Sequence, residues 1–217
     1  MKALRATALG TLAMSFASAS QAGFIALDVS GPALTRHDVA ANNEFGATLA
    51  GLGIDEYSTG ASLGTDVAGS VTFFYYGKEA GYRNTFAASG LSYSTSWSQR
   101  QNAFGAPIEI GSIAVGPGLL DFGFCSYNRA GSVGCVSNGQ NDGLGLWSWQ
   151  SIAMSIAGDT AWLFWDDSGS GPDDDYDDML VKAVFTPSTQ VPEAGSGALI
   201  GLGLLAIVVA RRRKQPK

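Results

Sequence analysis

Histidine is almost absent from the chain, and its scarcity limits the catalytic chemistry that can be expected. His37, beside Asp38, is the one histidine in 217 residues, and a lone histidine is more often a surface or core residue than a catalyst. The sequence also lacks a G-x-S-x-G motif, an H-E-x-x-H motif and a phosphate-binding loop. We therefore expect that the protein is not an enzyme.

Cysteine is scarce as well. Cys125 and Cys135 are the only two, too few for a structural zinc site without a partnering histidine. The residues between them, SYNRAGSVG, are rich in turn formers and suit a hairpin or loop closed by a disulfide. Such a ring would stabilise the fold by roughly 2–3 kcal/mol in the loop-entropy model. We expect a Cys125–Cys135 disulfide because the ends of the chain indicate export to an oxidising compartment.

No convincing long amphipathic helix occurs in the central region, which is instead rich in glycine, β-branched and aromatic residues. Glycine accounts for 29 of 217 residues, about twice its average usage. The strongest strand signal is VTFFYY at residues 71–76, which we expect to be buried on both faces. Turn residues separate it from further candidates at 24–29, 108–115, 119–124, 144–149, 151–157, 161–165 and 179–185. This spacing predicts one all-β domain over residues 23–186, an antiparallel β-sandwich that is jelly-roll-like.

Both ends of the chain differ from this domain. Lys2 and Arg5 precede an apolar run, and the small-residue site at Ala22 follows, so residues 1–22 are predicted to be a secretory signal peptide. At the other end, residues 195–210 carry no charge and a cluster of basic residues follows. A helix of that length is about 24 Å long, slightly short of a ~30 Å hydrocarbon core. Residues 195–217 are therefore predicted to be a transmembrane helix with a cytoplasmic basic tail.

The segment before this span holds a short motif. Val191-Pro192-Glu193, the Gly/Leu-rich span and the terminal arginine cluster together resemble the PEP-CTERM sorting signal of bacterial surface proteins. The resemblance implies that residues 187–194 are a linker with the sorting motif, and that the tail anchors the protein in the inner membrane. It also implies that an exosortase cleaves near the motif before the protein moves to the cell surface or the extracellular space. Ala194 stands where the family most often has a second proline.

Export changes the electrostatic character of the mature domain. The whole chain has a formal net charge of −6. Residues 23–190 retain 18 acidic and 6 basic side chains, a net charge of −12. Such a domain repels nucleic acid and anionic membrane surfaces and attracts cations or basic partners. We expect no nucleic-acid partner.

Seven aspartates lie between Asp166 and Asp178, in the stretch WDDSGSGPDDDYDDML, without any lysine or arginine. Apolar strand candidates flank the stretch, so we expect a loop with fixed ends. Two like charges ~6 Å apart in water repel by roughly 0.7 kcal/mol, and a bound divalent cation would remove that cost. Ca²⁺ accepts 6–8 oxygen ligands in irregular geometry. We expect a Ca²⁺ site that uses Asp166, Asp173, Asp175 and Asp177, and a merely solvated acidic loop is the alternative.

The motif D-x-D-Y-D-D at residues 173–178 resembles a recurring ending of secreted bacterial β-domains, in which an acidic loop precedes the last strand. The stretch YYGKEAGYRNTF at residues 75–86 is similar to the same group and offers Glu79 and Asn84. This second resemblance covers residues 70–186. It implies the same kind of domain and a calcium ion near its last strand.

Tryptophan suggests a different function. Trp147 and Trp149 share one face of a predicted strand, and an exposed pair could stack on sugar rings, although burial in the sandwich core is the simpler expectation. A calcium-dependent carbohydrate-binding module is therefore the alternative function. A glycan-acting hydrolase is a minor one, because its two carboxylates should face each other across a cleft.

Together these patterns predict an exported cell-surface or extracellular-matrix protein with a structural or adhesive role. Its expected partners are the exosortase that processes it, the inner membrane before processing, and an exopolysaccharide. Its expected cofactor is Ca²⁺.

Overall fold

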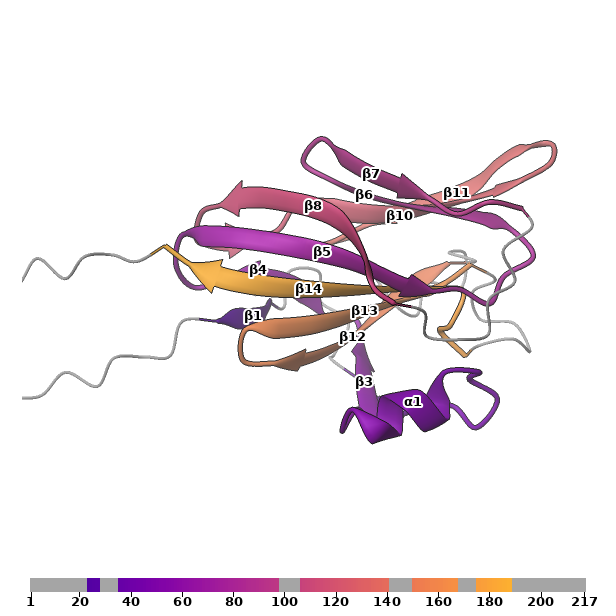
Figure 1. Ribbon diagram of the computed structural model, residues 1–217, viewed down its shortest axis with the longest axis horizontal. Helices are drawn as coiled ribbons and strands as arrows, with labels where there is room; N and C mark the ends of the chain where they lie inside the picture. The colour runs from indigo at the N-terminus through magenta and orange to yellow at the C-terminus, as the bar shows by residue number, and fades with distance from the viewer. Residues whose placement is uncertain (1–22, 28–34, 98–105, 141–149, 168–174, 189–217) are drawn as a thin grey trace, which may run out of the picture.

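Antiparallel sheets form most of the domain in the computed structural model, which describes residues 23–27, 35–97, 106–140, 150–167 and 175–188 (Figure 1). The largest sheet has seven strands. Their order across the sheet is β2 (Thr35–Asp38), β3 (Glu56–Thr59), β12 (Ser151–Ala157), β13 (Thr160–Asp166), β14 (Met179–Pro187), β5 (Gly69–Gly77) and β8 (Ile108–Val115). The last strand, β14, thus lies inside the sheet, hydrogen-bonded to β13 on one side and to β5 on the other.

Two smaller sheets complete the described domain. The four-stranded sheet has the order β11 (Gly131–Ser137), β10 (Phe122–Asn128), β6 (Arg83–Ala88) and β7 (Leu91–Ser94). The three-stranded sheet has the order β1 (Phe24–Leu27), β4 (Ser62–Thr65) and β9 (Gly118–Leu119). Figure 1 shows the four-stranded sheet stacked over the seven-stranded one, as in a sandwich. The prediction of an all-β domain made of antiparallel sheets is therefore confirmed.

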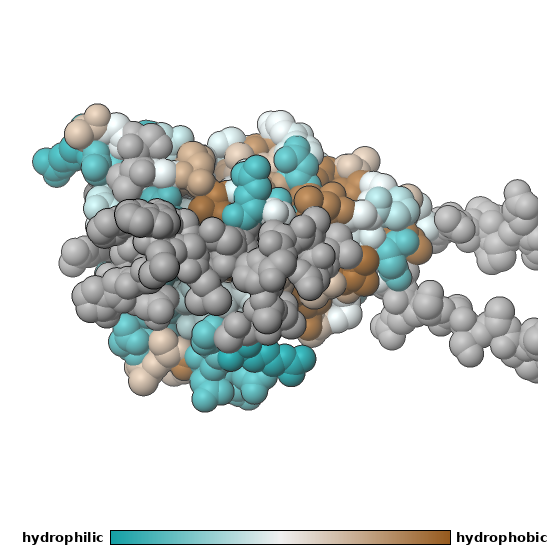
Figure 2. Space-filling model, turned by 180° about the vertical axis from the view of Figure 1, so that it is seen from behind, coloured by the Kyte–Doolittle hydropathy of each residue, from teal (hydrophilic) through white to brown (hydrophobic). Residues whose placement is uncertain are grey.

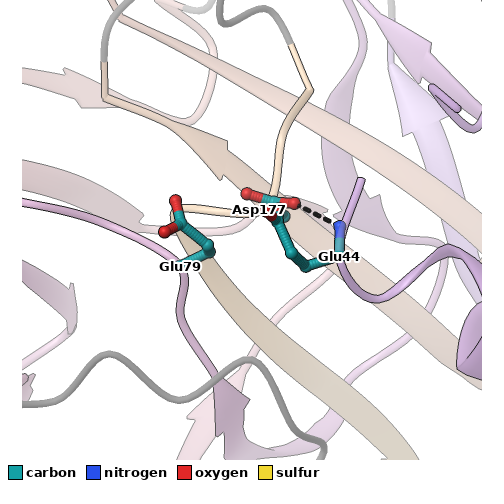
Figure 3. Close-up of side chains that lie close together, drawn as sticks. All are labelled: Glu44, Glu79 and Asp177. Carbon is teal, nitrogen blue, oxygen red and sulfur yellow. Dashed lines mark hydrogen bonds between the residues drawn. The ribbon is translucent and has the colours of Figure 1, made fainter. Parts of the chain in front are cut away.

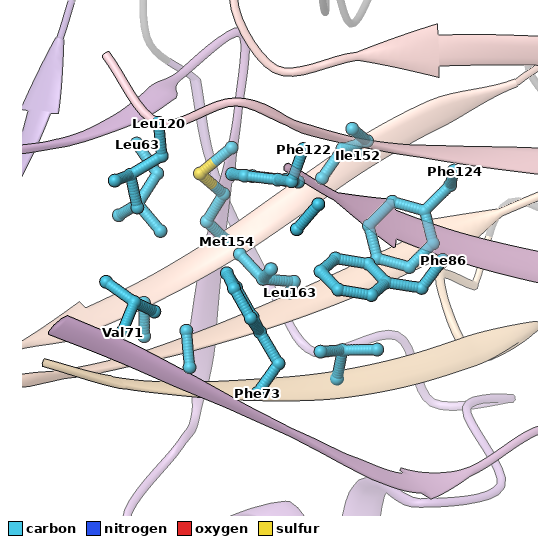
Figure 4. Close-up of a cluster of buried hydrophobic side chains, with 14 of the residues drawn as sticks. Leu63, Val71, Phe73, Phe86, Leu120, Phe122, Phe124, Ile152, Met154 and Leu163 are labelled. Atoms are coloured by element: carbon cyan, nitrogen blue, oxygen red, sulfur yellow. The ribbon is translucent and has the colours of Figure 1, made fainter. Parts of the chain in front are cut away.

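The main core lies between these sheets. Phe73 of β5 contacts Phe86 of β6 with ring centroids 4.9 Å apart, and Phe124 of β10 stacks on Trp165 of β13 at 5.3 Å. Figure 4 shows Phe73, Phe86 and Phe124 among the apolar side chains that point toward one another in this core. Full burial of one such side chain contributes roughly 1.5–3 kcal/mol. The aromatic and branched residues of the strands thus account for the stacking of the two sheets.

The strand VTFFYY is buried on one face only. Val71, Phe73 and Tyr75 face the main core, whereas the alternating residues between them are only half-buried. The prediction of burial on both faces was wrong here, because the outer face of the seven-stranded sheet is covered over only part of its area. Tyr76 packs on that outer face against Trp162, with ring centroids 4.8 Å apart.

The cover of that outer face is a short helix, α1 (Gly46–Gly51), which the sequence patterns did not predict. It ends in a Schellman motif: the Gly53 N–H donates to the Ala50 carbonyl, and the Ile54 N–H donates to the Leu49 carbonyl. Gly53 has φ +75°, the left-handed conformation that this motif needs. The helix buries apolar residues against the sheet in a second, smaller core: Phe45, Leu49, Ile54, Tyr57, Ala153, Trp162, Phe164, Tyr176 and Leu180.

The predicted disulfide is present. Cys125 of β10 and Cys135 of β11 are directly opposite in the antiparallel pair and are bonded to each other. Cys135 is exposed, so the bond is accessible from solvent. The disulfide therefore closes the hairpin that the turn-rich sequence between the cysteines predicts.

Several predicted segments lie outside the described residues. These are the signal peptide (1–22), the strand at 144–149, the sorting motif and the tail at 195–217. In the part of the chain that the structure describes, no helix is long and apolar enough to cross a membrane.

Candidate metal centre

The described aspartates of the acidic segment between β13 and β14 are buried in the protein and not exposed to solvent. The five aspartates that the structure describes there are at most 6% exposed, and Asp166 and Asp177 are 0% and 1% exposed. The full set is Asp166, Asp167, Asp175, Asp177 and Asp178. A solvated loop would leave its carboxylates in water, so this alternative does not describe these five residues. Buried carboxylates need hydrogen bonds, protons or cations to be stable.

Asp175 and Asp177 face the segment that leads into α1. The Asn42 side-chain amide donates to Asp175 Oδ2 (3.1 Å), and the Asn43 amide donates to the Asp175 carbonyl (2.7 Å). The Glu44 backbone N–H donates to Asp177 Oδ2 (2.7 Å). These contacts connect residues more than 130 positions apart in sequence and place the α1 segment, residues 39–57, against the acidic turn.

Tyr176, between these two aspartates, has a strained backbone. Its φ is +59°, in the left-handed region that a tyrosine rarely adopts and that costs on the order of 1–3 kcal/mol. The surroundings hold it there: its ring lies 5.0 Å from the Tyr57 ring, and its hydroxyl accepts a hydrogen bond from Ser151 Oγ (2.8 Å). Strain of this kind is concentrated at functional sites, where the surrounding structure fixes the geometry.

Glu44, Glu79 and Asp177 form a cluster of carboxylates, named here the three-carboxylate site (Figure 3). Each offers one oxygen, and these oxygens all lie within 4.8 Å of one another. Glu44 precedes α1, Glu79 follows β5, and Asp177 precedes β14. The Glu79 N–H also donates to the Asp177 carbonyl (2.9 Å), which holds the two backbones together.

The three-carboxylate site is open on one side and closed on the other. Glu44 is exposed and Glu79 half-buried, whereas Asp177 is almost fully buried. Asp177 Oδ2 accepts from the Glu44 N–H, but within the described part of the chain the buried Oδ1 has no hydrogen-bond partner. Burial, followed by hydrogen bonding to the Glu44 side chain and the charge of Asp175, raises the pKa of Asp177 to about 9. This environment favours a neutral carboxyl group or a bound cation.

Asp178 belongs to a different set of contacts, which links the two sheets. Its Oδ2 accepts from the Asp167 N–H (2.6 Å), and its carbonyl accepts from the Asn84 amide (3.0 Å). Asn84 also donates to Asp167 Oδ2 (2.8 Å) and accepts from Ser126 Oγ (2.8 Å). Burial, with the charge of Asp167 as the next cause, raises the pKa of Asp178 to about 10. The donors of Asn84 make this a structural polar network between β6, β10 and the acidic turn.

Of the four ligands expected from sequence, the three-carboxylate site contains one, Asp177. Asp175 contacts Asn42 and Asn43 nearby, and Asp166 is buried at the end of β13. Asp173 lies outside the described residues. The calcium-binding role of these residues remains a prediction.

The other two members come from elsewhere in the chain. Glu79 stands in the stretch YYGKEAGYRNTF that the second resemblance singles out, although not as a ligand. Glu44 follows two asparagines in a region of weak periodicity. The amide and carboxylate groups of the run Asn42-Asn43-Glu44 were the available signal for a polar or metal-binding site. Nothing in the sequence, however, pairs this run with a turn 133 positions away.

The remaining candidate residues are placed as follows. His37 is exposed on β2 and its ring forms a hydrogen bond with Thr59 (3.0 Å), so it is a surface residue. Trp147 and Trp149 lie outside the described residues, as do Val191, Pro192 and Glu193.

Comparison with known proteins identifies the C-terminal segment. The family model of the PEP-CTERM protein-sorting motif matches residues 190–214, which confirms the resemblance inferred from Val191-Pro192-Glu193 and the arginine cluster. No curated protein and no solved structure matches the chain. The chain therefore carries a PEP-CTERM sorting motif, which identifies it as an exported protein that is sorted by an exosortase.

Proposed function

We propose that the protein is a structural or adhesive component of the cell surface or the extracellular matrix. The observation that carries this proposal is the sorting motif at residues 190–214, which begins three residues after the end of β14 at Pro187. The sorting segment therefore follows, along the chain, a strand that lies inside the seven-stranded sheet. Tension on the tail would therefore act on a strand that is hydrogen-bonded on both sides.

Two further features suit an extracellular location. The Cys125–Cys135 disulfide needs an oxidising compartment. Hydrophilic side chains gather along the lower edge of the face in Figure 2, where Figure 1 places α1 and its neighbouring loops. Exposed acidic residues of this region include Glu44, Asp55 and Glu56. An acidic surface of this kind favours cations and basic partners.

Calcium is the proposed cofactor. Buried carboxylates between β13 and β14 gain stability from a divalent cation, and hard oxygen ligands favour Ca²⁺ or Mg²⁺. Extracellular calcium modules bind with dissociation constants of ~0.1–1 mM. In this proposal the domain reaches its full stability only after export, where calcium is plentiful.

Carbohydrate binding is the second candidate function. A groove of about 630 Å³ lies beside β3 and β12, and polar side chains including Arg36, Asp55 and Ser58 line it. Such groups can form hydrogen bonds with sugar hydroxyls. Co-sedimentation of the protein with the exopolysaccharide of its host, compared with Arg36→Ala, tests this candidate. Equal retention of both proteins on the polysaccharide would argue against a role for the groove.

The surface role is tested by localisation. In a host with an active exosortase, we expect the full chain at the cell surface or in the matrix fraction, and a variant without residues 190–214 in a different fraction. A Glu109→Gln variant, changed at an exposed position of β8, serves as the matched control and should be located like the wild type. Identical fractionation of the truncated and full-length chains would contradict the proposal. A structural role further predicts that cells lacking the protein lose matrix cohesion or adhesion.

A further inference from the structure

We propose that Glu44, Glu79 and Asp177 bind one calcium ion, and that this ion holds the α1 segment, residues 39–57, on the sandwich. This assignment rests on the calcium stabilisation proposed above, but it places the ion at a different set of ligands from the four aspartates expected from the sequence. Only one of the aspartates expected from sequence takes part, and two glutamates from other parts of the chain complete the site. The site thereby connects three segments instead of neutralising one loop.

The spacing of the oxygens fits calcium. Ca²⁺–O distances are about 2.3–2.6 Å, so two ligands on opposite sides of one ion are separated by up to about 5 Å. The three carboxylate oxygens lie within 4.8 Å of one another and can therefore share one ion. Mg²⁺ requires near-octahedral geometry at about 2.0–2.1 Å, which a site with one exposed and one half-buried glutamate is less able to enforce. Water would supply the remaining ligands from the open side.

A second observation points to a missing partner. Asp177 is 1% exposed, and its Oδ1 has no hydrogen-bond partner among the residues that the structure describes. The Glu44 N–H donates to Oδ2, and Figure 3 shows the side chains of Glu44, Glu79 and Asp177 close together. An unpaired buried oxygen costs on the order of 1–3 kcal/mol. A cation at the cluster removes this cost and the repulsion among the three carboxylates at once.

A shared proton is the competing explanation. Without a cation, a proton between Asp177 and Glu44 would also satisfy part of the cluster, since their side chains are within hydrogen-bonding reach. A proton shared by Asp177 and Glu44 does not involve the Glu79 carboxylate, however, whereas a cation uses all three carboxylates. Substitution of Glu79 therefore separates the two explanations.

The mechanical consequence follows from the positions of the ligands. The α1 segment contacts the rest of the domain through the second core, through β3 and through the contacts of Asn42, Asn43 and Glu44 with the acidic turn. A cation shared by Glu44, Glu79 and Asp177 adds a link from this segment to β5 and β14 at once. Removal of calcium should therefore loosen residues 39–57 before the two main sheets separate.

The test is calcium binding by the full-length protein in detergent, measured by isothermal titration with CaCl₂. We expect one site with a dissociation constant of ~0.1–1 mM, and weakening on the order of tenfold or more in Glu44→Gln and in Glu79→Gln. Both positions reach solvent, so these isosteric variants should fold. Glu109→Gln, on β8, is the matched control and should bind like the wild type.

The possible results separate two claims: that calcium stabilises the domain, and that the ion binds at the three-carboxylate site. If the wild type binds calcium but both glutamine variants keep its affinity, the site lies elsewhere and the assignment is wrong, while calcium stabilisation stands. If Glu44→Gln weakens binding and Glu79→Gln does not, the three-carboxylate site is also wrong. If the wild type binds no calcium at concentrations up to about 10 mM, far above the expected dissociation constant, both claims are wrong. Slower amide hydrogen exchange in residues 39–57 on calcium addition, lost in Glu79→Gln, supports the proposed link, and unchanged exchange there refutes it.

Discussion

The Glu44 backbone N–H donates a 2.7 Å hydrogen bond to Asp177 Oδ2, across 133 positions of sequence. This one contact orients the Asp177 carboxylate, whose Oδ1 has no hydrogen-bond partner among the described residues. It also places the Glu44 side chain beside Asp177 and Glu79.

Calcium should raise the melting temperature of the wild type. With a dissociation constant of about 0.5 mM, 5 mM calcium stabilises the native state by about 1.4 kcal/mol. For a domain of this size each kcal/mol shifts the melting temperature by roughly 2–4 °C, so a rise of about 3–6 °C over EDTA is expected in calorimetry. Equal concentrations of Mg²⁺ should give a smaller rise. A melting temperature that is the same in calcium and in EDTA would refute calcium stabilisation.

The calcium-free protein should lose stability as the pH rises. Burial and the groups Glu44 and Asp175 raise the pKa of Asp177 to about 9, and burial and Asp167 raise that of Asp178 to about 10. A carboxyl group with a raised pKa binds its proton more tightly in the folded state. Its contribution to stability is complete below the ordinary pKa of 3.8 and is lost as the pH rises through 9 to 10.

The measurement is a series of melting curves in EDTA from pH 5 to pH 9, repeated in calcium. The melting temperature in EDTA should fall across the series. The increment from calcium should grow with pH, because the ion binds the deprotonated carboxylates. Asp177→Asn, which keeps an acceptor for the Glu44 N–H, should flatten the slope in EDTA. A melting temperature in EDTA that rises steadily with pH contradicts the protonated state assigned to these residues.

Asn84→Ala should destabilise the domain strongly. The Asn84 amide donates to Asp167 Oδ2 and to the Asp178 carbonyl, and it accepts from Ser126. Its loss leaves these buried groups without their partner and should lower the free energy of unfolding by roughly 2–3 kcal/mol in urea denaturation. Thr85 lies on the same strand as Asn84, and Thr85→Ala removes an exposed hydrogen bond to Ser94 of β7, so it should change the free energy of unfolding by less than about 0.5 kcal/mol. Similar effects of the two substitutions would mean that the network contributes little.

Removal of the disulfide should weaken the domain moderately. Cys125→Ala with Cys135→Ala opens the ring between β10 and β11 and should cost roughly 2–3 kcal/mol in the free energy of unfolding. Because Cys135 is exposed, dithiothreitol should reproduce the effect in the wild type. Calcium affinity should stay unchanged in the double variant, since the disulfide lies in the other sheet from the three-carboxylate site. A loss of calcium binding on reduction would contradict this independence.

Much of the sheet structure could be predicted from the sequence because its signals are local. The run MLVKAVF predicts β14, and a glycine-aspartate turn separates β12 from β13. The helix α1 was missed because six residues are too few for a helical period to stand out. Its position depends on Leu49 and Ile54 meeting Trp162 and Phe164 on a distant strand.

The candidate site could be predicted only in part, because it too depends on contacts between distant parts of the chain. The aspartates are visible as a charge run, and Asp177 is among the residues expected to bind metal. The burial of Asp175 and Asp177 is a tertiary property: it arises where residues 42–44 approach the turn at Tyr176, whose backbone is in the left-handed conformation. A charge run alone suggests repulsion within one loop, whereas the folded chain supplies two glutamates from outside it.

The most direct test is an anomalous difference map from crystals grown in millimolar calcium. The account predicts one calcium peak within about 2.3–2.6 Å of carboxylate oxygens of Glu44, Glu79 and Asp177. A calcium peak bound only by aspartates of the 166–178 turn, or no peak between the three carboxylates at saturating calcium, would contradict it.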